Sequence, residues 1–126
     1  MANNRLMLGF GSKVFIGFLL LLFCFQNVYG ADLNKKEEDT FYVAVKAYED
    51  GFYDVALTLL DRFLKTYAQS DKRFDAFAYV GQCYFFQEKY LKALDQFETL
   101  LKTEGAEVIK DKILFWLGEI YAKGKD

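Results

Sequence analysis

The stretch YDVALTLLDRFLKT, residues 53–66, aligns with YLKALDQFETLLKT, residues 90–103, at an offset of 37 residues. Tyrosine, alanine, leucine, lysine and threonine recur in register. Positions between them stay apolar, as where Leu60 matches Phe97 and Phe63 matches Leu100. A repeat of this length is typical of stacked supersecondary units that cannot bury their apolar faces alone. The period therefore indicates a binding protein before it indicates an enzyme.

The repeated stretches have the apolar spacing of an α-helix. From Ala56 through Leu60 to Leu64, apolar residues recur at three- or four-residue steps, so one helical face is apolar. Beyond residue 30 no segment shows sustained two-residue alternation. We therefore predict an all-α chain with helices over residues 37–50, 53–67, 72–87, 90–103 and 107–123. Connections of two to five residues make consecutive helices antiparallel.

The first 30 residues have the composition of a secretory signal peptide. Arg5 and Lys13 carry positive charge, residues 14–25 are an unbroken apolar run, and a polar exit follows. We expect cleavage after Gly30, export, and a periplasmic or cell-envelope location. Two alternatives stay open. In the first, the apolar run is not cleaved and stays as a membrane anchor, although a helix needs about 20 residues to span a bilayer. Otherwise Cys24 carries a lipid, against which the bulky preceding Phe23 argues.

The rest of the chain lacks the features of several functional classes. After residue 30 it keeps 14 Lys and Arg against 18 Asp and Glu, a net charge of −4 with mixed signs, so no basic face suits nucleic acid. The membrane is contacted only through the signal segment, if that segment is retained. Cys83 is then the single cysteine, and no internal disulfide forms. Residues 31–36 form a charged linker to the helical domain, residues 37–126.

Catalytic chemistry is not indicated. The chain has no histidine, so neither Ser70 nor Cys83 has an imidazole to activate it. No Cys or His spacing suits zinc, and no calcium-binding loop is present. We expect no enzyme activity, no metal and no cofactor, and we interpret Cys83 as a small buried apolar residue.

The helical pattern resembles the tetratricopeptide repeat, which combines small residues, a hairpin glycine and aromatics at fixed places in two helices. The repeat-defining residues are Ala44, Gly51, Tyr53, Ala56, Gly81, Tyr84, Tyr90, Ala93 and Gly118. The alanines, Gly81 and Gly118 fall where helix backbones approach closely. The resemblance implies a right-handed α-solenoid of about two and a half units, residues 37–70, 71–106 and 107–126.

The chain departs from that family in two ways. Its period is 37 rather than 34 residues, and Ala68 and Gly105 replace the frequent proline after the second helix. The longer period is similar to that of bacterial envelope proteins of the outer-membrane assembly lipoprotein and Tol-associated coordinator types. The resemblance therefore implies a non-catalytic scaffold that binds other envelope proteins or their peptide segments.

Projection at 37-residue offsets predicts the faces of the first helix in each unit. Tyr79, Cys83 and Trp116 fall on the face toward the preceding unit, where the first unit is polar, as a terminal repeat requires. The last helix has an uncapped apolar face, formed by Leu114, Leu117 and Tyr121. We expect the native protein to continue beyond residue 126 or a partner helix to dock there. In a third interpretation, this chain is an accessory domain fused to an enzyme that follows residue 126.

The concave groove is the candidate partner site. Its predicted residues are Phe41, Val45, Tyr48, Gln82, Phe85, Phe86, Phe115 and Glu119. Exposed aromatic side chains are typical of peptide-binding surfaces. The opposing interpretation is that these aromatics only fill a small core. The alternative function is structural self-association through the uncapped face. The sequence does not identify the partner or the oligomeric state.

Overall fold

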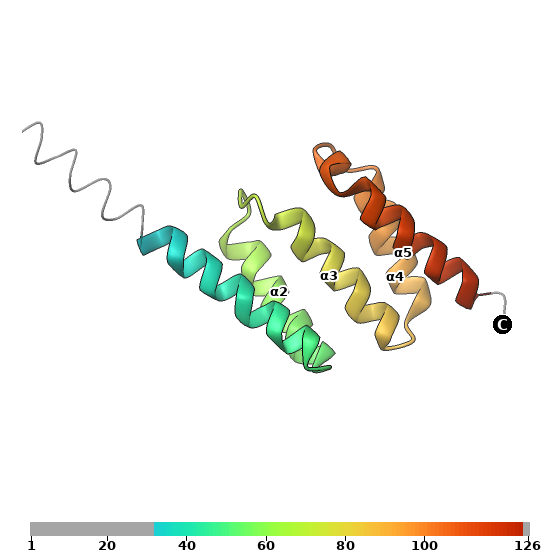
Figure 1. Ribbon diagram of the computed structural model, residues 1–126, viewed down its shortest axis with the longest axis horizontal. Coiled ribbons are helices and arrows are strands. Elements are labelled where there is room, and N and C mark those ends of the chain that lie inside the picture. Colours follow the sequence, from blue (N-terminus) through green and yellow to red (C-terminus); the bar gives the residue numbers. More distant parts are fainter. Residues whose placement is uncertain (1–31, 125–126) are drawn as a thin grey trace, which may run out of the picture. The chain divides into compact units, whose positions relative to one another are not determined.

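The computed structural model describes residues 32–124, and all regular secondary structure in this range is helical, which confirms the all-α fold class (Figure 1). Residues 32–49 form the first described helix. The elements that follow are α2 (Tyr53–Thr66), α3 (Arg73–Phe86), α4 (Tyr90–Leu101), the short 3-10 helix η1 (Ala106–Ile109) and α5 (Lys110–Lys123). The chain divides into two units, Met1–Lys36 and Glu37–Asp126, and the second unit has the bounds of the predicted helical domain.

Two predicted boundaries differ from those observed. Residues 32–36, which we expected to be a linker, are helical. The last α-helix begins at Lys110 rather than at residue 107, because η1 precedes it. Gly105 turns the chain with a φ of 85°, and the amide of Ala106 then donates to the carbonyl of Thr103. The expected signal segment lies outside the described residues. None of the helices within residues 32–124 is long and apolar enough to cross a membrane.

The two helical hairpins close with the same backbone turn. The amide of Gly51 donates to Tyr48, as the amide of Glu88 does to Phe85, 37 residues later. The next amide reaches back five residues in both turns, from Phe52 to Ala47 and from Lys89 to Tyr84. Gly51 has a φ of 80° and Glu88 a φ of 61°. Glu88 therefore has the same left-handed backbone conformation as Gly51, the residue that it matches in the first hairpin.

Residues of α3 belong to both clusters of the hydrophobic core. Ala76 and Cys83 pack with the cluster that contains Leu60 and Phe63 of α2. Other side chains of α3, such as Phe85, pack with the cluster built from α4, η1 and α5. The apolar side chains of α3 are spread around the helix because α3 has neighbours on several sides. Residues 37–49 of the first described helix, α3 and α5 run alongside one another in Figure 1.

Burial follows the 37-residue offset. Residues that match across the offset are buried at both positions, in α2 and α4 and again in α3 and α5: Ala56 and Ala93, Leu60 and Phe97, Phe63 and Leu100, Ala76 and Ile113, and Cys83 and Ile120. The same spacing that aligns the sequence thus aligns the core, and it places α2 and α4 in equivalent environments.

Candidate functional site

Six aromatic side chains form a continuous run across three helices, and we call this run the aromatic face. It consists of Phe41, Tyr48, Tyr79, Phe86, Phe115 and Trp116. The Tyr79 ring centroid lies 6.2 Å from that of Phe41 and 5.0 Å from that of Tyr48. Phe86 continues the run, at 6.0 Å from Tyr48 and 5.8 Å from Trp116. Phe115 ends it on α5, 5.5 Å from Trp116.

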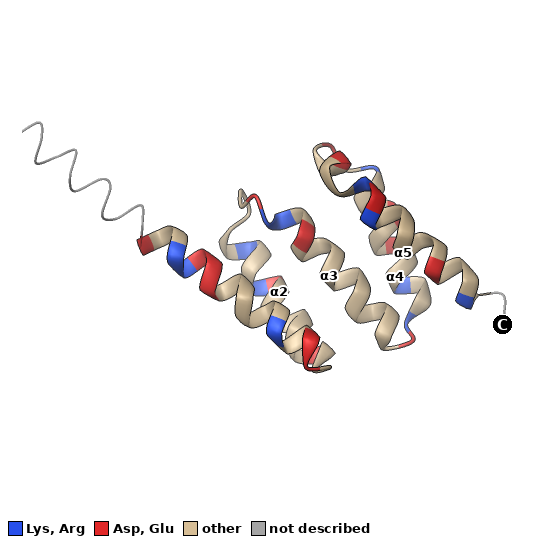
Figure 2. Cartoon of the chain, viewed as in Figure 1, with Lys and Arg blue, Asp and Glu red and all other residues tan. Residues whose placement is uncertain are grey.

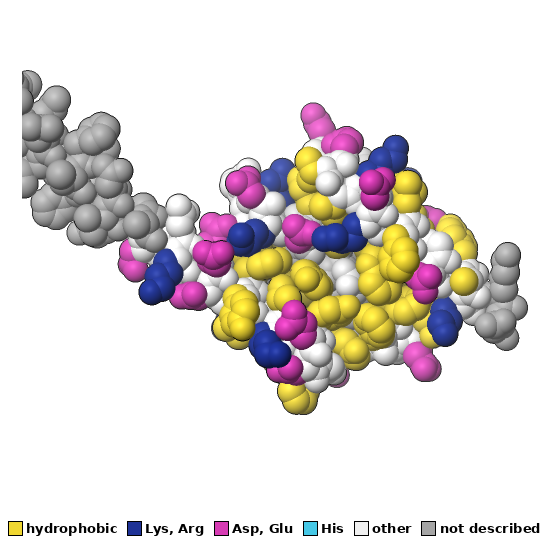
Figure 3. All heavy atoms as spheres, in the orientation of Figure 1, with side chains coloured by type: hydrophobic (Ala, Val, Ile, Leu, Met, Phe, Trp, Pro, Cys, Tyr) yellow, Lys and Arg dark blue, Asp and Glu magenta, His cyan; other side chains and the backbone are white. Residues whose placement is uncertain are grey.

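Part of this face is open to solvent. Phe86 is 45% exposed and Phe115 is 59% exposed, while the other four rings are partly buried. Figure 3 shows a band of apolar side chains across residues 37–49, α3 and α5, with charged side chains along its edges. Aromatic residues that remain exposed in contact with one another are enriched at protein-binding surfaces. The face is therefore the strongest candidate for partner contact.

A pocket of about 240 Å³ lies at one end of the aromatic face. Phe41, Val45 and Tyr79 supply apolar walls, and Glu38 and Lys72 supply one charge of each sign. The amine of Lys72 lies 6.0 Å from the centre of the Phe41 ring. The pocket can accept one apolar side chain, and its lining includes charged groups of both signs.

The charges around the face are mixed in sign. Lys112 of α5 pairs with Asp75 of α3, and Lys46 pairs with Asp50 one helical turn away. Figure 2 shows both signs distributed over the helices of the described chain. The aromatic face therefore favours a ligand through apolar contact more than through net charge.

The predicted groove residues are only partly brought together on this face. Phe86, Phe115 and Glu119 are exposed, and Phe41, Val45 and Tyr48 are partly buried. Gln82 and Phe85 do not fit the prediction, because they are 7% and 9% exposed. The Phe85 ring is held in the core, within 5.5 Å of Tyr90 and 5.3 Å of Trp116.

Tyr79 and Trp116 contribute to the aromatic face, although the projection placed them on the face toward the preceding unit. Tyr79 joins Phe41 to Tyr48, and Trp116 joins Phe86 to Phe115. Tyr79 contacts the first described helix and Trp116 contacts α3, as the projection predicted, and both side chains stay partly exposed. The aromatic identity of both residues at the 37-residue offset was the signal that could have identified them.

Gln82 has a structural role instead. The hydroxyl of Tyr48 donates to Gln82 Oε1 at 2.8 Å and so links the first described helix to α3. Burial, with smaller contributions from Cys83 and neighbouring tyrosines, raises the pKa of Tyr48 to about 12. The hydroxyl keeps its proton at neutral pH and stays a hydrogen-bond donor.

The repeat-defining residues occupy the core and the turns, with one exception. Ala44, Ala56, Gly81 and Ala93 are buried, Gly51 is in a turn, and Tyr53, Tyr84 and Tyr90 are partly buried. A Cβ at Gly81 would lie 2.5 Å from Cε2 of Phe97, so only glycine allows that ring so close. Gly118 is exposed, and a Cβ there would meet nothing within 4 Å. The predicted close approach at Gly118 is therefore wrong, because no described helix packs on it.

The predicted uncapped face is also only partly exposed. Leu114 and Tyr121 are 47% and 54% exposed, as expected for an uncovered surface. Leu117 is 8% exposed because it belongs to the core cluster with Phe97 and Ile120. Leu117 is thus a core residue rather than part of the open face.

Cys83 is buried, and burial raises the pKa of its thiol to about 12. It contacts the core cluster of α2 and the first described helix, in keeping with a packing role. Between residues 32 and 124, no group of three or more His, Cys, Asp or Glu side chains is placed to hold a metal ion.

A search against models of protein families found no match, and searches of curated proteins and of solved structures found no significant match.

Proposed function

We propose that this chain is a non-catalytic protein-binding module that holds a segment of another polypeptide against the aromatic face. The observation that carries the proposal is the unbroken run of ring contacts from Phe41 to Phe115, with Phe86 and Phe115 left open to solvent. Large rigid aromatic side chains contribute much contact area with little loss of conformational entropy on binding. An apolar or aromatic segment, extended or helical, suits such a surface.

We also propose that the helices form about two and a half units of tetratricopeptide type in a right-handed solenoid. Support comes from the two identical hairpin turns and from the burial of residues matched at the 37-residue offset. In such a stack the helix of residues 32–49, α3 and α5 share one face. The aromatic face lies on these same three helices.

The proposed setting is the bacterial cell envelope, which the chain reaches by export through its first 30 residues. Its partner is then another envelope protein. Mixed charge around the aromatic face supports recognition by shape and apolar contact, without a cluster of cations to clamp a terminal carboxylate. No cofactor and no nucleic acid takes part.

A pair of charge substitutions tests the proposal. The variant carries Phe86→Glu and Phe115→Glu, at positions that are 45% and 59% exposed, so that each glutamate can be solvated. Phe85 is unsuitable because it is 9% exposed, and a buried glutamate there would unfold the chain. The matched control carries Val55→Glu and Val108→Glu, which are 53% and 80% exposed outside the aromatic face.

Proteins recovered from an envelope extract are compared for the wild type and both variants, each checked for helical content. The proposal predicts that partners are retained by the control and lost by the face variant. Equal recovery by a folded face variant would remove the proposal.

A further inference from the structure

The surface of α5 repeats the surface of α3 on which α4 packs. At the 37-residue offset, Phe77 matches Leu114, Gly81 matches Gly118, and Tyr84 matches Tyr121. On α3, the backbone carbonyl of Phe77 accepts from Gln96 of α4, and the Phe97 ring fills the space over Gly81. No described residue fills the space over Gly118.

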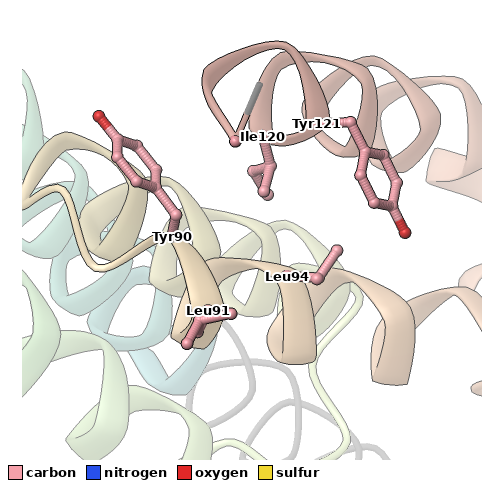
Figure 4. Close-up of a pocket in the computed structure, with 6 residues that line it drawn as sticks. Tyr90, Leu91, Leu94, Ile120 and Tyr121 are labelled. Carbon is pink, nitrogen blue, oxygen red and sulfur yellow. The ribbon is translucent and has the colours of Figure 1, made fainter. Parts of the chain in front are cut away.

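The open surface continues into an apolar pocket between α4 and α5. The pocket measures about 380 Å³ and is lined by Tyr90, Leu91, Leu94, Ile120, Tyr121 and Gly124. Figure 4 shows Leu94 of α4 and Ile120 of α5 directed toward one another across the pocket, with Tyr121 on the α5 side. Leu91 is 84% exposed, so a partner that covers it gains the hydrophobic stabilisation of burying a leucine side chain.

Charges around Tyr121 indicate what kind of helix fits. On α3, the amine of Lys92 in α4 lies 5.7 Å from the centre of the Tyr84 ring. On α5, the hydroxyl of the matching Tyr121 donates to Glu98 Oε1 at 3.1 Å. A lysine that enters over Tyr121, as Lys92 does over Tyr84, would therefore also meet the Glu98 carboxylate. The open site is complementary to a helix with the charge pattern of α4.

We propose that Leu114, Gly118, Tyr121 and the adjoining pocket form a docking site for an amphipathic helix of another protein. The contact face of that helix reproduces the Lys92, Ala93 and Phe97 pattern of α4, and its bulky residue occupies the space over Gly118. A second copy of this chain is the weaker occupant, because its own Ala93 and Phe97 are fully buried.

A synthetic peptide with the sequence of residues 89–103, labelled with a fluorophore, serves as the probe. Anisotropy titration with the 126-residue chain should give saturable one-to-one binding. A peptide with Phe97→Asp should bind at least about tenfold more weakly, because the residue over Gly118 is then charged. The protein variant Gly118→Leu should bind the wild-type peptide more weakly by a similar factor. The variant should keep the fold of the protein, since the space around Gly118 is open.

The Phe86→Glu and Phe115→Glu variant should bind this peptide unchanged, which separates the site from the aromatic face. Peptide binding that is absent, or that is insensitive to both Phe97→Asp and Gly118→Leu, would overturn the proposal. Sedimentation supplies a second test. A wild-type dimer that Gly118→Leu dissociates would show that the site takes a second copy, and this would overturn the assignment to another protein.

Discussion

Replacing Gly81 with alanine should lower the free energy of unfolding, whereas the same change at Gly118 should raise it. Both glycines are inside helices, so alanine gains about 0.5–1 kcal/mol of helix stability at each site. At Gly81 the new Cβ would lie 2.5 Å from the ring of Phe97, which is fully buried. Such overpacking costs about 1–3 kcal/mol, so Gly81→Ala should be destabilising by about 1 kcal/mol in net terms.

The gain in helix stability from alanine is the same at both glycines, so the difference in unfolding free energy between the two variants gives the packing cost at Gly81. Gly118→Ala should therefore exceed Gly81→Ala in stability by about 1–3 kcal/mol, measured by urea unfolding with circular dichroism detection. Equal stability of the two variants would mean that α4 does not pack on Gly81 as described.

The first hairpin suggests how to relieve this clash. It has Ala44 and Leu60 where the second hairpin has Gly81 and Phe97. Alanine is larger than glycine and leucine is smaller than phenylalanine, so the two differences offset one another in volume. Gly81→Ala should be neutral or stabilising when Phe97→Leu is already present. A double-mutant cycle measures this coupling, which should be about 1 kcal/mol or more. A coupling near zero would indicate that the two side chains do not share the space.

The backbone at Glu88, the buried Cys83 thiol and Tyr48 hydroxyl, and the signal segment each allow a further test. Glu88→Gly should stabilise the chain by about 1 kcal/mol in urea unfolding, because Glu88 has a φ of 61°; a loss of stability would contradict this. Burial raises the pKa of Cys83 and of Tyr48 from 9.0 and 10.0 to about 12, so the unfolded chain loses these protons first. The melting temperature should therefore fall above about pH 9, less steeply in Cys83→Ala, and an unchanged slope would exclude the thiol as a cause. N-terminal sequencing of the protein from envelope fractions should begin at Ala31, and an intact Met1 would exclude cleavage.

The helices were predictable because their cause is local. Apolar residues at three- and four-residue steps define a face that must be buried, and Gly51 and Gly105 adopt the left-handed conformations that end or redirect the chain. Glu88 falls in the gap between the helices predicted over residues 72–87 and 90–103, but its left-handed backbone was not predicted. A glutamate there is disfavoured, and only its place 37 residues after Gly51 indicates the conformation.

The candidate site was less predictable because a register position defines only the direction of a Cβ. Tyr79 and Trp116 begin on a face between helices, yet their rings extend far enough to join the open surface. Phe85 begins on the predicted groove, yet its ring turns inward to contact Tyr90 and Trp116. Gly118 could not be judged from its repeat position, since its environment depends on whether a helix covers it.

Site-specific photo-crosslinking can show whether the aromatic face contacts a segment of another polypeptide. A photoreactive phenylalanine analogue is placed at Phe86 on the aromatic face and, as a control, at Val108 on η1, which is 80% exposed. After irradiation in intact cells, mass spectrometry identifies the covalent products. We expect the residue 86 probe to join a defined segment of another protein, while the residue 108 probe gives no such product. Crosslinks at residue 108 with none at residue 86 would contradict this expectation.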